Sequence, residues 1–95
     1  MRKITQEAVN ALRWEYEYTN SNTKVYYQSG HYIMSLHNND IASINLFGTL
    51  RITNAWWFST TTKERLNGLP WVSICQKKGT WYLNGKEWNG EWIVV

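Results

Sequence analysis

The sequence predicts an α+β domain in which the helices cover one face of a single-layer antiparallel sheet. The first observation is a change of hydrophobic period, from helical spacing before Asn20 to alternation of apolar and polar residues after it. The second is a helix signal near residues 61–68 that is followed by strand-like runs and turn dipeptides. The predicted order is an N-terminal helix, a four-stranded antiparallel meander, a short second helix and a C-terminal β-hairpin.

The first predicted helix covers residues 5–18. Thr5 is the candidate N-cap, and Ala8, Leu12 and Tyr16 follow the three-to-four spacing of one buried stripe. The polar run after Tyr18 ends this pattern, so the helix is expected to stop there.

Four short runs with a period of two predict the meander, because the connections between them are short and rich in Gly, Asn and Asp. The runs are Lys24–Gln28, Tyr32–His37, Ile41–Leu46 and Leu50–Thr53. Alternation assigns a buried face and a polar face to the sheet. The expected buried side chains are Val25, Tyr27, Tyr32, Met34, Leu36, Ala42, Ile44, Leu46, Leu50 and Ile52.

The second predicted helix is about two turns long. Thr61 is placed as its N-cap, with Glu64 completing a capping box, and Gly68 is expected to leave the helix in a left-handed conformation before Pro70.

The chain is then expected to form a hairpin with Lys77-Lys78-Gly79 at its turn, and its expected inward side chains are Val72, Ile74, Trp81 and Leu83. The last segment, Glu91–Val95, is apolar on both faces. It is therefore expected to be either a covered strand or an exposed edge that a second copy could pair with.

Length and composition indicate one globular domain over residues 1–95, since 43% of the residues are hydrophobic and 18% are charged. No apolar run approaches the ~20 residues that span a bilayer, and the N-terminus shows no signal-peptide pattern. The lone Cys75 suits a reducing compartment. We therefore expect a cytoplasmic protein without membrane contact.

Candidate catalytic and metal-binding groups do not form a recognisable site. His31 and His37 are six residues apart on one strand, roughly 20 Å, which is too far to share a metal ion. An aspartate such as Asp40 near His37 is ordinary in a surface turn and does not indicate a metal site. Glu15 and Glu17 point to different sides of the predicted helix, so they cannot form a paired carboxylate site. We expect no enzyme activity, no cofactor and no metal.

Three strings carry a resemblance to a known family: MRKITQEAVNA, the segment Ser59–Asn67, and LPWVSICQKKGTWYLNGKEWNGEW. Together they resemble a family of small, uncharacterised proteins of tailed bacteriophages. The resemblance spans most of the chain. Two departures are Trp71, where the loop is usually small, and Trp56-Trp57-Phe58, which is more aromatic than the family pattern. Both indicate a surface specific to this member.

Three functional hypotheses follow from the resemblance, the net charge of +3 and the seven Trp and six Tyr residues. The first is a phage accessory protein that inhibits a host defence factor, of the anti-CRISPR or anti-restriction type, by stoichiometric binding through aromatic anchors. The second is weak binding of single-stranded nucleic acid by stacked aromatics and scattered cations. These cations are Arg51, Lys63, Arg65, Lys77, Lys78 and Lys86. The third is a homo-oligomeric structural protein that pairs through its C-terminal strand.

The predicted partner-binding surface brackets the second helix, because aromatic residues precede its start and follow its end. Three consecutive aromatics cannot all point inward, so at least one is expected to be exposed. Trp14 and Trp81, by contrast, are expected in the core. The predicted site residues are Trp56, Trp57, Phe58 and Trp71, with Lys63 and Arg65 as a polar rim.

Overall fold

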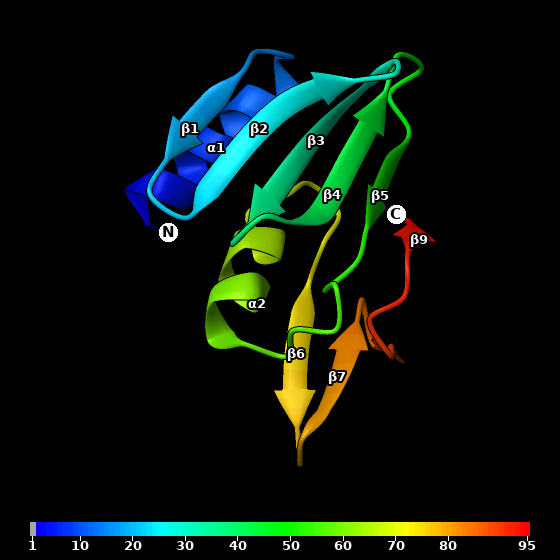
Figure 1. The fold of residues 1–95 in the computed structure, drawn as a ribbon. Helices are drawn as coiled ribbons and strands as arrows, with labels where there is room; N and C mark the ends of the chain where they lie inside the picture. The colour runs from blue at the N-terminus through cyan, green and yellow to red at the C-terminus, as the bar shows by residue number, and fades with distance from the viewer. Residues whose placement is uncertain (1) are drawn as a thin grey trace.

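The computed structural model describes residues 2–95, so Met1, the first residue of the predicted domain, lies outside the described residues. Its α+β class and its order of elements agree with the prediction (Figure 1). The helices are α1 (Lys3–Arg13) and α2 (Thr60–Asn67). The strands are β1 (Tyr18–Asn20), β2 (Thr23–Gln28), β3 (His31–Leu36), β4 (Asn39–Asn45), β5 (Leu50–Ile52), β6 (Ile74–Lys77), β7 (Thr80–Leu83), β8 (Lys86–Glu87) and β9 (Ile93–Val94).

The strands form two sheets, which differs from the predicted single layer. The predicted meander, β2-β3-β4-β5, is extended by β1 on one side and by β9 on the other, giving six antiparallel strands. The C-terminal hairpin β6-β7 gains β8 after the Asn84-Gly85 turn and forms a separate three-stranded sheet. Figure 1 shows that this second sheet extends beyond α2, away from α1.

The core lies between α1 and the inner face of the large sheet. Ala8 and Leu12 of α1 are buried, as are Val25, Met34 and Ile52 on neighbouring strands, so the predicted alternation is confirmed along the middle of the sheet. Figure 1 shows α1 behind β1 and β2.

The alternation fails at two positions and is shifted at a third. Tyr27 is half exposed near the end of β2, where it meets Tyr32 edge-on, and Leu46 is exposed because β4 already ends at Asn45. The register between β3 and β4 shifts at Met34/Ser35, and Ile41, which the alternation had not assigned to the buried face, is buried.

The first helix starts earlier and ends earlier than predicted. Arg2 is its N-cap, and Thr5 lies buried inside the first turn instead of capping it. Trp14 is the C-cap and Glu15 has a φ of 60°, which ends the helix before Tyr16 can continue the buried stripe. The prediction that Trp14 is a core residue is therefore wrong, since its side chain is 70% exposed.

The second helix is capped by Ser59, not by Thr61. The Ser59 hydroxyl accepts a hydrogen bond from the backbone N–H of Thr62 at 3.1 Å, as an N-cap side chain does three residues into a helix. Gly68 has a φ of −76°, so it is not the predicted left-handed exit. Gly68 instead allows α1 to pack closely against the end of α2, because a Cβ there would lie 2.7 Å from Thr5 Cγ2 and 3.0 Å from Val9 Cγ2 of α1.

Candidate functional site

Arg65 does not belong to a surface rim, which corrects the prediction for this residue. Its guanidinium is buried between the two helices and the large sheet. Nε donates to Thr23 Oγ1 at 3.1 Å, and one terminal nitrogen donates to Thr5 Oγ1 at 2.6 Å and forms an ion pair with Glu64. Thr5 in turn donates its hydroxyl hydrogen to Glu64. Arg65 therefore joins α1, α2 and β2 and is removed from any binding surface.

The four predicted aromatic site residues are all exposed. The exposed fractions are 67% for Trp56, 59% for Trp57, 53% for Phe58 and 77% for Trp71. Their positions define two surface segments, the entry loop of α2 (residues 54–59) and the exit loop (residues 68–73).

Two of these tryptophans, Trp56 and Trp71, have a left-handed backbone conformation, which residues with a Cβ rarely adopt. In the entry loop, Ala55 and Trp56 have φ values of 52° and 65°, and Trp57 N donates to Asn54 O at 2.8 Å across this tight turn. In the exit loop, Trp71 has a φ of 61°. The left-handed region costs roughly 1–2 kcal/mol for a residue with a Cβ, whereas glycine adopts it freely.

Side-chain hydrogen bonds hold both loops in place. Asn54 Oδ1 accepts from Trp56 N at 2.8 Å, and its backbone N–H donates to Gly90 O at 3.1 Å. In the exit loop, Asn84 Nδ2 donates to Trp71 O at 2.9 Å. The two strained tryptophans are therefore presented by fixed turns.

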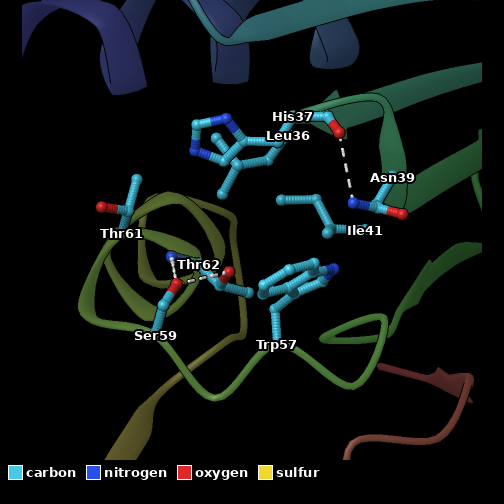
Figure 2. A pocket seen from close by; sticks show the side chains of 8 residues that line it. All are labelled: Leu36, His37, Asn39, Ile41, Trp57, Ser59, Thr61 and Thr62. Carbon is cyan, nitrogen blue, oxygen red and sulfur yellow. Dashed lines mark hydrogen bonds between the residues drawn. The ribbon is translucent and has the colours of Figure 1, made fainter.

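A hollow of about 410 Å³ lies beside the entry loop (Figure 2). Ile41, Leu36 and the indole of Trp57 form its apolar lining, as Figure 2 shows. Polar groups of the β3-β4 turn and of the α2 N-terminus complete it: His37, Asn39, Ser59, Thr61 and Thr62. The hollow suits an uncharged side chain, because its lining contains no Lys, Arg, Asp or Glu.

The predicted site is divided between the two ends of α2. An eight-residue helix rises ~12 Å, and Trp71 is not among the residues that line the hollow beside Trp57. Phe58 turns instead toward the second sheet, where its ring meets Trp81 edge-on with centroids 5.3 Å apart. Trp81 is buried, as predicted.

Lys63 also faces the second sheet. Its Nζ donates to Gln76 Oε1 at 3.0 Å and lies 5.8 Å from the centroid of the Trp81 ring. Of the two predicted rim residues, Lys63 is therefore at the surface next to the aromatic residues, and Arg65 is not.

Several apolar residues are exposed that the sequence analysis did not assign to the surface. Phe47 is 93% exposed in the turn after β4, and Trp92 is 49% exposed next to β9. The sequence signal that could have predicted the exposure of Phe47 is its place in a turn. Asn45 Oδ1 accepts hydrogen bonds from both Phe47 N and Thr49 N in that turn. Ile93 and Val94 are exposed at the edge of the large sheet, so the exposed-edge alternative holds for β9.

Two tyrosines have raised pKa values. Burial and then a hydrogen bond from its hydroxyl to Asp40 Oδ1, 2.7 Å long, raise the pKa of Tyr26 to about 12. Burial and the hydrogen bond to Glu7 raise the pKa of Tyr18. Asp40 is thus the hydrogen-bond acceptor of Tyr26. The described part of the chain contains no cluster of three or more His, Cys, Asp or Glu residues placed to hold a metal ion. Neither α1 nor α2 is long and apolar enough to cross a membrane.

Comparison with known families gives one match over nearly the whole chain. A family model described as Kyanoviridae Gp96 protein matches residues 1–94. No curated protein and no solved structure matches the chain.

Proposed function

We propose that this chain, which belongs to the Kyanoviridae Gp96 protein family, is a small phage accessory protein that binds a host protein stoichiometrically. The observation that carries the proposal is the backbone of Trp56 and Trp71. Both side chains are largely exposed, and both residues occupy the left-handed region in which glycine would be unstrained. Other residues of the chain adopt this conformation in turns, but Trp56 and Trp71 combine it with a large exposed aromatic side chain, which is the combination that a binding site uses.

The entry loop supplies the anchor in this proposal. Trp56 and Trp57 are large side chains with few rotatable bonds, and the neighbouring hollow offers a place for an apolar side chain of the partner. Trp71 adds a second contact from the exit loop.

The class of partner that we propose is a protein of host defence, such as a restriction or CRISPR component, which the phage protein would block in the host cytoplasm by covering a surface. A blocking protein needs a rigid fold and anchors, and it needs no chemistry of its own. This target class rests on membership of a phage family and on the two loops described above.

The experiment compares baits for affinity capture from host bacterial extract, followed by titration of the purified partner. Trp56→Gly and Trp71→Gly remove an anchor and relieve the backbone, so both variants should fold. Trp14→Ala and Trp92→Ala are matched controls, since they remove exposed tryptophans outside the two loops. Loss of an anchor worth ~2 kcal/mol should raise the Kd of Trp56→Gly about 30-fold, while both controls bind like the wild type.

Recovery of the same partner in equal amount and with equal Kd by all five baits would refute the proposal for this surface. A defence-inhibition assay then tests the target class: the wild type should restore phage growth on a strain that carries the defence system, and Trp56→Gly should not. A protein that forms a homodimer split by the loop variants would instead favour self-assembly.

A further inference from the structure

The hairpin β6-β7 gathers positive charge at one end of the molecule. Residues 74–83 contain Lys77 and Lys78 and no acidic residue. Lys63 of α2 reaches the same hairpin, since its Nζ contacts Gln76, the residue before Lys77. Figure 1 shows the hairpin projecting past α2, with its turn at the far end from α1. Lys77 and Lys78 thus lie at the exposed end of the hairpin, and Lys63 contacts its β6 strand.

A second hollow, of about 490 Å³, lies next to this charge. It extends along the part of β7 that β8 does not cover, and its lining includes Gly79 of the hairpin turn and Thr80 at the start of β7. Phe58, Trp81 and Trp88 form its aromatic wall. Trp81 and Trp88 are buried, so Phe58 provides the accessible ring, held edge-on against Trp81.

We propose that this hairpin and hollow bind single-stranded nucleic acid, with a base stacked on Phe58 and the adjacent phosphates beside Lys77 and Lys78. The combination favours nucleic acid over an acidic protein, because a nucleic acid strand alternates flat rings with negative charges, and both features find a counterpart within a few residues here. The proposal does not rest on host-protein binding by Trp56 and Trp71.

Glu87 provides an internal check on this electrostatic argument. It is the one acidic side chain that lines the hollow, and it repels phosphates. Its replacement should therefore strengthen binding, whereas replacement of the lysines should weaken it.

The test is fluorescence anisotropy of a labelled oligothymidylate of about 12 nucleotides, titrated with the full chain at several salt concentrations. For a single strand, each phosphate contact contributes about −0.7 to the slope of log K against log salt. Lys77→Gln/Lys78→Gln should reduce the slope by about 1.4. The control Lys3→Gln/Arg13→Gln removes the same charge from exposed positions on α1 and should leave the slope close to that of the wild type.

Phe58→Ala should weaken binding at least about 5-fold through the lost stacking contact, and Phe58→Leu provides a second variant if the alanine variant melts early. Glu87→Gln should tighten binding. Each variant is first compared with the wild type by thermal melting.

Any of three results would overturn the proposal. These are no binding at about 50 mM salt, equal effects of Lys77→Gln/Lys78→Gln and Lys3→Gln/Arg13→Gln, or equal competition by polyglutamate, which would identify a general acidic ligand. Trp56→Gly and Trp71→Gly should bind the oligonucleotide normally, so this proposal and that of host-protein binding can fail independently.

Discussion

The inner side of α2 and its two flanking loops use polar and aromatic residues in opposite ways. On the inner side, Arg65 is buried and its hydrogen bonds join both helices to β2. In the loops, Trp56 and Trp71 are exposed and the backbone is strained to hold them there. The residue types alone would suggest the reverse. The comparison teaches that burial here follows hydrogen bonding and backbone geometry, and that the strained aromatic residues are the ones available to a partner.

The largest expected effect on stability comes from removing the hydrogen bonds and the ion pair of Arg65 on the inner side of α2. Arg65→Met removes the hydrogen bonds to Thr5 and Thr23 and leaves Glu64 without its ion pair. We expect a loss of about 3 kcal/mol or more in the free energy of unfolding, measured by urea denaturation. Arg51→Met, at the one exposed position of β5, is the control and should change the free energy of unfolding by less than ~0.5 kcal/mol. A cost below about 1 kcal/mol for Arg65→Met would contradict a locking role.

The next effect tests the close contact between the helices. Gly68→Ala places a methyl group against Thr5 Cγ2 and Val9 Cγ2, and overpacking of this kind costs typically about 1–3 kcal/mol. Thr5→Ser removes the nearer methyl group and keeps the hydroxyl that serves Glu64 and Arg65. The double variant should therefore regain part of the stability lost in Gly68→Ala, which a double-mutant cycle measures. Additive costs would show that the contact with Thr5 is not the cause.

A small effect is expected in the loops. Trp56→Gly and Trp71→Gly relieve left-handed strain, but glycine gives up about 0.5–1 kcal/mol through the greater freedom of the unfolded chain. The two terms nearly cancel, so the unfolding free energy should stay within about 1 kcal/mol of the wild type or rise. Trp81→Ala in the core should cost ~3–5 kcal/mol by the same assay. A large loss in either loop variant would mean that these tryptophans stabilise the fold after all.

The smallest effect concerns Tyr26, whose hydrogen bond to Asp40 lies on the outer face of the large sheet. Its folded pKa of about 12 exceeds the ordinary value of 10.0, so the folded state favours the protonated phenol. This contribution to stability is complete below pH 10 and is lost as the pH rises from 10 to 12. Tyr26→Phe should show a shallower decline of melting temperature over that range. Identical declines would exclude Tyr26 as the source.

The middle of the large sheet was predictable from the sequence, because the alternation along each strand decides which side chains are buried. Val25 in β2, and Leu50 and Ile52 in β5, are buried beside the exposed residues Lys24 and Arg51, and their burial follows from a period of two. The strand β9 was harder, since its partner β5 is distant in the sequence and only two residue pairs join them.

The errors arose where several residues competed for one role. Ser59 and Thr61 are both plausible caps, and the choice depends on where the chain enters α2. Arg65 looks like a surface residue because its partners Thr5 and Thr23 come from other elements. Gly68 resembles a helix terminator, but the reason for its size is the neighbouring helix.

The contact of Gly90 with Thr53 and Asn54 joins two segments of the chain that are far apart in the sequence. Gly90 O accepts from both Asn54 N and the Thr53 hydroxyl, and Gly90 Cα lies so near Asn54 that a Cβ would fall 2.2 Å from Oδ1. The hairpins of β1–β5 close over short stretches of chain and can form early. The strand β9 reaches β5 only after residues 55–89 have been brought back on themselves, at the entropic cost of closing a long loop. We therefore expect β9 to pair with β5 late in folding, after the local hairpins of the large sheet.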